Sequence, residues 1–467
     1  PTLTTAATLA PPTRIPTYVV DTATIPASTS GPMNTYYTQG GDTLNILARR
    51  FGVIPSQIIA AQVLPPLDEL LLPDTLLLIP KNSSQAERTP ANHIIPDCEF
   101  VDGPTSLGFN IHDYLLSTGG YLSTHDIDSG SEGKTDGAQA VQRLSKDNSL
   151  GPRLILALIE YESHWVLGKE KNGISNDYTM GFNDYRYKGL YRQLMLATST
   201  LSFGYYNWRS GTLNEIKFKD GKVLKLSPYL NAATAAIQYY FAQTHTYDDW
   251  VKIVDPKGFP ALYESMFGPV AERAKYYEPT LTYGLTQPEL SLPFQIGQVW
   301  AFTGGPHPAW EEQGALAAID FAPSALLNGC HDNPAWVVAP ADGVVVRDGP
   351  GLVILDLDGD GLEETGWNIM FLHIAAKDRV AVGTVMKKND IIGHPSCEGG
   401  VATGTHLHIA RKYNGEWILA DGALPFNMDG WIVHNGAAPY KGTLTRNGKT
   451  INACTCSTFD TNIIREK

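Results

Sequence analysis

The apolar positions follow two different patterns along the chain. Between about residues 100 and 285 they form helix-like runs: Gly151-Pro152 precedes RLILALIEY, and NAATAAIQYYFA at 231–242 is rich in Ala. From about residue 295 onward, short β-branched or aromatic runs alternate with Gly, Asp and Asn turns, as in WVVAPADGVVVRDG, GLVILDL, NIMFLHIA and HLHIARKYNGEWILA. The pattern predicts a mainly helical domain followed by an antiparallel, β-rich domain, and so a multidomain α+β protein.

Length and local composition divide the chain further. A chain of 467 residues suits about three domains. Residues 1–35 are rich in Thr, Pro and Ala without any period, which is typical of an extended linker, and residues 82–99 begin with a second polar linker. The predicted domains are therefore 36–81, 100–290 and 291–467.

Charge and hydropathy narrow the function classes. Lys and Arg number 35 against 48 Asp and Glu, so a net charge of −13 gives no attraction to nucleic acid or to an anionic bilayer. No apolar run reaches the roughly 18 residues of a membrane-spanning helix. The chain starts at Pro1, which fits a mature exported protein and equally a recombinant fragment. We expect a secreted or cell-envelope protein.

Residues 36–81 read YYTQGGDTLNILARRFGVIPSQIIAAQ and end in LLLIPK. The pattern predicts a strand, a helix starting at Gly41-Asp42-Thr43, a second short helix and a closing strand. The GDTL, FGV and LxIP phrases resemble a LysM module, a small βααβ fold. The resemblance implies binding of N-acetylglucosamine-containing glycans such as peptidoglycan. The alternative is a small βααβ domain without a ligand.

Histidines and one aspartate stand at the ends of strand-like runs in the last domain. His406-Leu407-His408 places two imidazoles on the same face of a strand, because side chains alternate with a period of two. His307 follows Gly304-Gly305-Pro306, and Asp320 and His373 lie in AIDF and FLH. We expect these residues to line one groove.

Together these residues resemble the lysostaphin/LytM family of zinc endopeptidases that cleave peptidoglycan peptides. The resemblance implies that His307, Asp320 and His408 hold Zn²⁺ and that His373 and His406 are catalytic. Common members place the first ligand four residues before the Asp, where this chain has Leu316. The wider spacing and the CEGG…THLHIARKYNGEW segment are similar to the β-lytic branch, which also implies a Cys330–Cys397 disulfide. The competing interpretation is a site that has lost a ligand.

The resemblance implies a secreted peptidoglycan hydrolase, anchored to the wall glycan through the LysM-like module. Three protein ligands leave one position of zinc open, as in catalytic sites, and bound water then becomes acidic enough to react near neutral pH. A catalytically degenerate envelope-binding protein is the alternative from another class. Cys454 and Cys456 are two residues apart, so we expect one of them to pair with Cys98 rather than with its neighbour.

A second cation is expected in the same domain. Asp356, Asp358 and Asp360 occupy positions 1, 3 and 5 of a loop with Gly361 at position 6 and Glu364 at position 9. This is the ligand order of Ca²⁺ loops. The alternative is an acidic, solvated hairpin turn.

Glu162-Ser163 ends the apolar run of the helical domain, and GLYRQLMLATSTL follows at 189–201. These phrases resemble lytic transglycosylases and goose-type lysozymes. The resemblance implies a lysozyme-like domain in which Glu162 acts as the acid on a glycosidic oxygen. The alternative is a lysozyme-like helical domain used for glycan binding or spacing, with Glu162 structural.

Overall fold

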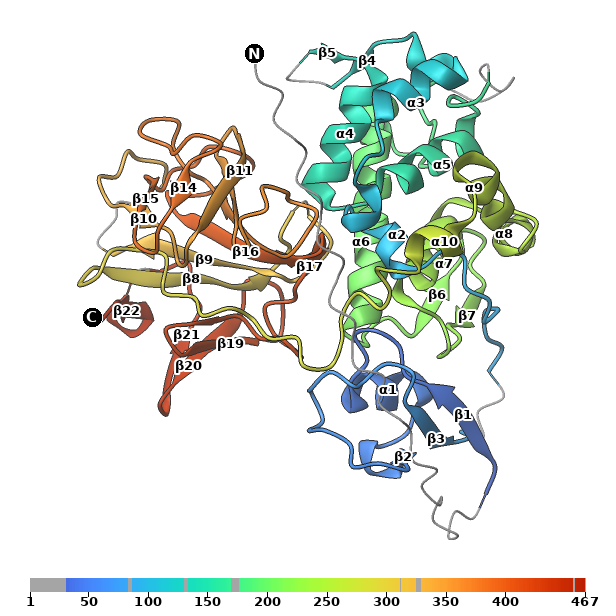
Figure 1. Cartoon of the computed structure of the whole chain (residues 1–467), viewed down its shortest axis with the longest axis horizontal. Helices are drawn as coiled ribbons and strands as arrows, with labels where there is room; N and C mark the ends of the chain where they lie inside the picture. Colours follow the sequence, from blue (N-terminus) through green and yellow to red (C-terminus); the bar gives the residue numbers. More distant parts are fainter. Residues whose placement is uncertain are drawn as a thin grey trace, which may run out of the picture.

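The computed structural model describes residues 31–82, 86–129, 133–168, 176–310, 312–324, 329–456 and 458–466. A small N-terminal module, a helical part and a β part follow one another along the chain (Figure 1). The mixture of helices and antiparallel sheets confirms the expected multidomain α+β class. Of the predicted linker 1–35, residues 1–30 lie outside the described residues.

In the N-terminal module the first strand pairs with the last. β1 (Met33–Tyr37) pairs antiparallel with β3 (Leu76–Pro80), whose other edge holds β2 (Ile59–Ala60). α1 (Leu44–Phe51) begins where the GDT phrase predicts, because the Thr43 side chain accepts a hydrogen bond from the backbone N–H of Ile46. The predicted second short helix is present as η1 (Pro55–Gln57), a 3-10 helix of one turn, and the residues after it extend and pair with β3.

The helical part has one apolar core. Pro152 starts α5, and Asn231 caps α7 by accepting a hydrogen bond from the Thr234 N–H, so both predicted helices are confirmed. Gly204 of α6 lies against Ala236 of α7, where a Cβ would come within 2.8 Å of the Ala236 Cα. The helices are α2 (Asp97–Phe100), α3 (Ile111–Thr118), α4 (Gly137–Asn148), α5 (Pro152–Ser163), α6 (Leu190–Arg209), α7 (Ala232–Thr244), α8 (Tyr247–Val254), α9 (Phe259–Phe267) and α10 (Val270–Ala274), with short hairpins β4–β5 (Ile127–Asp128, Lys134–Thr135) and β6–β7 (Glu215–Lys217, Val223–Lys225).

The second predicted linker is shorter than the sequence indicates. Arg88 bridges to Lys225, and the backbone N–H of Thr89 donates to the Lys225 carbonyl. Ile94 and Ile95 are buried in the helical core. The helical part therefore starts near residue 88, because the apolar residues of this segment pack on it.

The β part is built on a nine-stranded antiparallel sheet. The order is β14-β11-β12-β13-β16-β9-β8-β22, and β17 pairs with β16; a second sheet has the order β18-β19-β20-β21. The predicted β-rich runs are confirmed as β8 (Val299–His307), β9 (Ala318–Pro323), β10 (Val337–Val338), β11 (Gly343–Gly349), β12 (Leu352–Asp356), β13 (Trp367–Leu372), β14 (Val385–Met386), β15 (Ile391–Gly393), β16 (Leu407–Tyr413), β17 (Glu416–Trp417), β18 (Asn427–Met428), β19 (Trp431–Asn435), β20 (Gly442–Arg446), β21 (Lys449–Asn452) and β22 (Asn462–Ile464).

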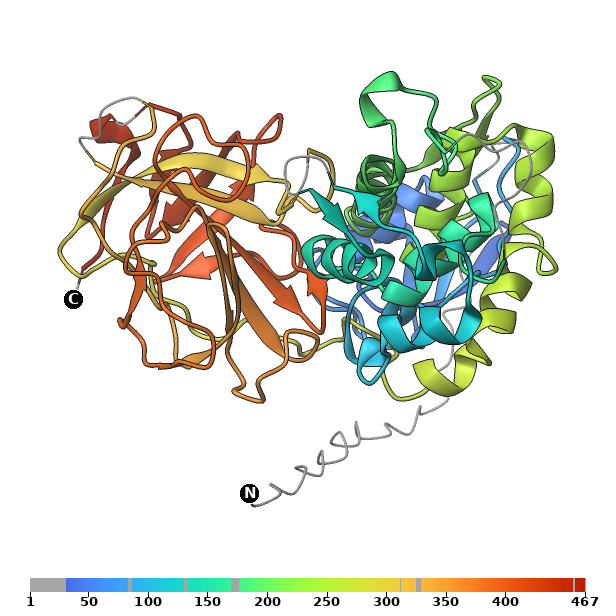
Figure 2. The same ribbon diagram turned by 90° about the horizontal axis from the view of Figure 1, so that it is seen from above.

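The large sheet buries both of its faces. Successive side chains of a strand point to opposite faces. Phe371 and Ile409 belong to the core of the β part, whereas their neighbours Met370 and Ala410 belong to the core of the helical part. Figure 1 shows β16 and β17 beside α6, and Figure 2 shows the two parts side by side from above. The helical part therefore covers the sheet face that carries Ala410 and, two residues earlier, His408.

A buried arginine joins all three parts. Arg209, at the end of α6, is 6% exposed and forms ion pairs with Glu416 of β17 at 2.8 Å and with Asp97 of α2 at 3.1 Å. It also donates to the carbonyl oxygen of Gly40 and, at 2.9 Å, to the Thr280 hydroxyl. The same guanidinium thus contributes to the position of the N-terminal module, together with hydrogen bonds from Arg50 to the Trp208 carbonyl and from Gln39 to the Tyr229 carbonyl.

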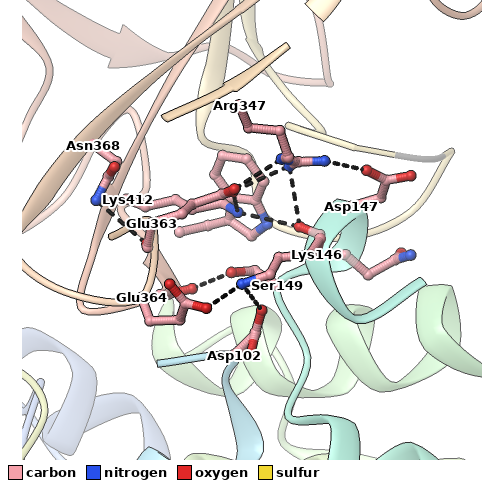
Figure 3. A network of polar contacts seen from close by, with 12 residues as sticks. Asp102, Lys146, Asp147, Ser149, Arg347, Glu363, Glu364, Asn368 and Lys412 are labelled. Atoms are coloured by element: carbon pink, nitrogen blue, oxygen red, sulfur yellow. Dashed lines mark hydrogen bonds and ion pairs between the residues drawn. The ribbon is translucent and has the colours of Figure 1, made fainter. Parts of the chain in front are cut away.

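A second polar network crosses the boundary between the helical and β parts (Figure 3). Arg347 of β11 pairs with Asp147 of α4 at 2.6 Å and with Glu363 at 2.8 Å. Lys412 of β16 pairs with Glu363 at 2.8 Å. Lys146 pairs with Glu364 and, at 3.1 Å, with Asp102. The acidic turn after β12 therefore contacts the helical part directly through Glu364, whereas Glu363 pairs with two basic residues of the β part.

This network makes stability depend on pH. Burial alone would raise the pKa of Glu363, but Lys412 and Arg347 outweigh it and lower that pKa to about 2. Because the folded pKa lies below the unfolded value, the stabilisation is complete above about pH 5 and is lost as pH falls toward 2, at about 3 kcal/mol in total. We expect the difference in unfolding free energy between wild type and Glu363→Gln to be largest above pH 5 and to shrink below pH 4 in urea titrations. A difference that is constant from pH 7 to pH 3 would contradict this.

Across the part of the chain that the structure describes, none of the helices has the length and apolar composition needed to cross a bilayer.

Candidate metal centre

Three strands bring the predicted zinc ligands together. His307 ends β8, Asp320 lies in β9 and His408 lies in β16. The register pairs His408 directly with Asp320 and His307 with Ala318. Both glycines before His307 are required, because a Cβ at Gly304 would collide with the Asp320 carboxylate and one at Gly305 with the backbone of Lys441.

The three side chains converge on one point. His307 Nε2 lies 2.9 Å from His408 Nδ1 and 3.2 Å from Asp320 Oδ1, and His408 Nδ1 lies 3.4 Å from the same oxygen. One ligand atom from each residue falls within 4.8 Å of the others. Asp320 Oδ1 is buried and has no hydrogen-bond partner. Two nitrogens and an otherwise unsatisfied carboxylate oxygen fit a zinc ion with three protein ligands.

The other ring nitrogens of the two ligand histidines contact backbone carbonyls. His307 Nδ1 lies 2.8 Å from the Gly305 oxygen, and His408 Nε2 lies 3.1 Å from the Ala309 oxygen. Each carbonyl accepts a hydrogen bond from the protonated nitrogen and leaves the opposite nitrogen with a free lone pair. This outer contact is usual for metal-binding histidines, because it fixes the tautomer and the ring orientation.

The site carries opposed charges in a buried position. Burial alone would raise the pKa of Asp320, but His307, His408 and His406 hold it well below its usual value. Burial alone would lower the pKa of His307, but the Asp320 carboxylate raises it. For His408 burial prevails and the pKa is lowered. Asp320 is therefore anionic at neutral pH, as a metal ligand must be.

His373 and His406 lie beside this group. Their ring centroids are 4.4 Å apart, and His406 Nε2 is 3.7 Å from Asp320 Oδ1. Each Nδ1 lies 2.8 Å from a backbone oxygen, that of Glu398 for His373 and that of Gly404 for His406. These contacts leave both Nε2 atoms with free lone pairs. Burial, followed by the charge of His406, lowers the pKa of His373 to about 4.

The backbone of His373 adopts an unusual conformation. Its φ is +64°, in the left-handed region that non-glycine residues seldom enter. The His373 carbonyl accepts hydrogen bonds from the backbone N–H and the hydroxyl of Ser396. Strained residues held in this way are concentrated at functional sites.

Tyr440 is a neighbour of the site that the sequence did not indicate. Its ring stacks on His307, with centroids 4.2 Å apart and planes at 19°. Its backbone N–H donates to the Pro306 carbonyl, and the residue is 50% exposed. Tyr440 lies in a turn between β19 and β20, far from every motif, so only the folded arrangement identifies it.

The predicted calcium loop is brought together only in part. Asp356, Asp358 and Asp360 place one carboxylate oxygen each within 4.8 Å of one another. Glu364 instead pairs with Lys146 of the helical part, because the turn directs its last carboxylates toward that boundary. Calcium binding by the three aspartates stays a prediction.

Glu162 lies in the last turn of α5, as predicted. Its side chain is 7% exposed, with the Tyr240 hydroxyl at 3.4 Å and His245 Nε2 at 3.6 Å. The neighbouring Glu160 instead accepts hydrogen bonds from the backbone N–H groups of Val166 and Leu167, which is a structural role.

One of the two disulfides is the one expected from the sequence, and the other is not. Cys330 and Cys397 are bonded, as expected. The expected partner for Cys98 is wrong: Cys454 and Cys456 are bonded to each other, and Cys98 is free and buried in the helical part. Two bridged cysteines can be only two residues apart when their Cα atoms lie 5.0 Å apart, within the usual range.

Removal of the Cys330–Cys397 bond, with both cysteines replaced by Ser, should lower the unfolding free energy by about 2–4 kcal/mol, because the bond closes a long loop. It should also disturb the orientation of the His373 ring, because the carbonyl of the adjacent Glu398 orients that ring. Denaturant titration measures the first effect, and the NMR signals of the His373 imidazole measure the second. The matched control is the pair Cys454→Ser and Cys456→Ser, which should change neither quantity noticeably. Equal effects of the two double variants would contradict the assignment.

The structure is thus an antiparallel sheet that carries a group of two histidines and one aspartate. Three protein ligands are the number found in catalytic zinc centres. Residues 93–279, less than half of the chain, match the family model described as LasA, N-terminal domain. No curated protein matches the chain significantly.

Several solved structures are similar to part of the chain. Pseudoalterin, described as an M23 metalloprotease from the deep sea, is 20% identical over 36% of this chain and 96% of its own, with a TM-score of 0.31. A zinc-containing peptidase from Vibrio cholerae is 19% identical over 30% and 41%, with a TM-score of 0.20. The catalytic domain of lysostaphin from Staphylococcus simulans is 22% identical over 27% and 89%, with a TM-score of 0.19. These similarities are too distant to assign an activity.

Proposed function

We propose that the chain is a zinc-dependent endopeptidase that cleaves the peptides of peptidoglycan. The observation that carries the proposal is the convergence of His307, Asp320 and His408 beside His373 and His406. The motifs around these five residues resemble the lysostaphin/LytM family, which supplies the substrate class. The orphaned Asp320 oxygen supports a metal ligand rather than a structural ion pair.

The residues divide into two roles. His307 Nε2, Asp320 Oδ1 and His408 Nδ1 would hold zinc, which when bound polarises a carbonyl and acidifies water. His373 and His406 each present an unprotonated Nε2, because a backbone carbonyl accepts a hydrogen bond from each Nδ1–H. One Nε2 accepts a hydrogen bond from the attacking water and takes its proton. The proton then passes to the nitrogen of the leaving amine.

The remaining assignments follow the same proposal. We place the protein outside the cytoplasm, in the envelope or secreted, because that is where peptidoglycan lies. The N-terminal module would bind N-acetylglucosamine-containing glycan, as its GDTL and LxIP phrases suggest. The net charge of −13 supports attachment through sugar contacts rather than through attraction to anionic polymers.

Product identification tests the proposal. Purified peptidoglycan is incubated with the full chain, and the soluble products are analysed by mass spectrometry. New amino termini are the expected result, and they should disappear in His406→Ala, which keeps all three zinc ligands. Intact peptides with new reducing or anhydro sugar ends would overturn it.

Cleavage of glycan by Glu162 is the second candidate. It is favoured by the burial of that carboxylate at a helix end, beside Tyr240 and His245. The same product analysis with Glu162→Gln distinguishes the two: sugar ends that vanish in this variant identify Glu162 as the acid, whereas unchanged amino termini assign the activity to the metal centre.

A further inference from the structure

The loop that joins β8 to β9 orients a metal ligand of another strand. His307 and Asp320 flank this loop, and the carbonyl of Ala309 within it accepts a hydrogen bond from His408 Nε2 at 3.1 Å. This contact decides which ring nitrogen of His408 carries the proton and therefore which one faces His307 and Asp320. A shift of the loop would change the position of a ligand that lies about a hundred residues further along the chain.

Backbone contacts give the loop its shape, and apolar packing holds it in place. The Ala309 N–H donates to the Ala315 carbonyl at 2.9 Å, and the Ala317 N–H donates to the same carbonyl at 2.7 Å. All three alanines are buried. They belong to the apolar core of the helical part and not to the core of the β part. The loop is therefore held by a neighbouring domain.

Helix α6 makes the direct contacts. The hydroxyl of Ser199 donates to the Gln313 carbonyl at 3.3 Å. At Gly314 an added Cβ would lie 3.4 Å from the Cβ of Ser202, so the loop and the helix lie close together there and leave room for no more than a small group. Both serines are buried. Figure 2 shows the yellow strands β8 and β9 running toward the helical part, as this contact requires.

We propose that α6 positions the metal ligand His408 through the β8–β9 loop, with Ser199 as a positioning residue and the small side chain of Ser202 leaving the loop its space. The helical part is then a component of the metal centre and not only a spacer or a glycan-binding domain. The inference rests on the proposed function, since it concerns the residues that would hold zinc. Its consequence is that a change on α6 alters zinc affinity although no ligand is touched.

The test compares zinc binding by full-length variants. Ser202→Leu adds bulk against Gly314 and should raise the zinc dissociation constant about 10-fold or more, in the range seen when outer contacts of metal ligands are lost. Ser199→Ala removes only the hydrogen bond to Gln313 and should have a smaller effect in the same direction. Dissociation constants are measured by competition with a chromophoric chelator. The absorption spectrum of the Co²⁺-loaded protein reports ligand geometry independently.

Two controls separate positioning from general damage. Ser202→Ala adds no bulk beside Gly314 and should keep both the wild-type zinc affinity and the wild-type Co²⁺ spectrum. Ser117→Leu makes the same substitution at an exposed position of α3 and should change neither. A folded Ser202→Leu or Ser199→Ala protein with wild-type affinity and spectrum overturns the inference alone. A wild-type chain that binds no zinc overturns the proposed function and this inference with it.

Discussion

Replacement of Asp320 by Asn is expected to abolish zinc binding and to lower peptide cleavage by at least about 1000-fold, or about 4 kcal/mol of transition-state stabilisation. Asp320 is the single anionic residue of the three-ligand group, and its Oδ1 lies 3.2 Å from His307 Nε2 and 3.4 Å from His408 Nδ1. An amide presents no charge to the metal, and its NH₂ group cannot coordinate. Without the carboxylate, two buried imidazoles remain as ligands, and no negative charge among the ligands offsets the charge of the dication.

Metal analysis by mass spectrometry and release of amino groups from purified walls measure the two effects. Asp342→Asn is the matched control, because this aspartate lies in the same part of the chain but is exposed and pairs with Lys387. It should keep full zinc content and activity. An Asp320→Asn protein that holds one zinc per chain and cleaves at the control rate would contradict the assignment of the ligands.

Replacement of Arg209 by Met is expected to lower the unfolding free energy by about 3–5 kcal/mol. The substitution leaves the carboxylates of Glu416 and Asp97 buried without a countercharge. It also removes the donor to the Gly40 carbonyl, which links the N-terminal module to the other two parts. We therefore expect the contacts among all three parts to loosen, although the module keeps other contacts such as that from Arg50 to the Trp208 carbonyl.

Denaturant titration gives the change in stability, and the rate of limited proteolysis near residue 82 reports loosening of the module. Arg186→Met is the control, because Arg186 pairs with Asp184 on the surface and its loss should leave stability unchanged. If Arg209→Met behaved like Arg186→Met, the three parts would not be joined through this buried charge.

The sequence selected the residues of the candidate metal centre better than their surroundings. The period of two places His406 and His408 on one face of a strand, and the resemblance to the lysostaphin/LytM family added His307, Asp320 and His373. Their convergence depends on the register between β9 and β16, which a single sequence does not specify. Tyr440 was missed for this reason, since it reaches His307 only through the folded turn after β19.

Contacts between domains were the least predictable. Glu364 fits a calcium-loop pattern by spacing, but a lysine more than two hundred positions earlier in the chain takes it as a partner. Burial of the Arg209 and Glu416 pair and packing of Ala315 into the core of the helical part likewise depend on how whole domains meet. The second helix of the N-terminal module is no longer than one 3-10 turn for a local reason, because Ile59 and Ala60 soon after it pair with β3.

We hold that the His307, Asp320 and His408 group supports zinc-dependent cleavage of wall peptides. The most direct test measures new amino termini released from purified peptidoglycan by the full chain after removal of metal and again after addition of one equivalent of zinc. We expect no release from the metal-free protein, recovery with zinc, and no recovery for His408→Ala. Equal release before and after removal of metal, or the same release by His408→Ala, would contradict the claim.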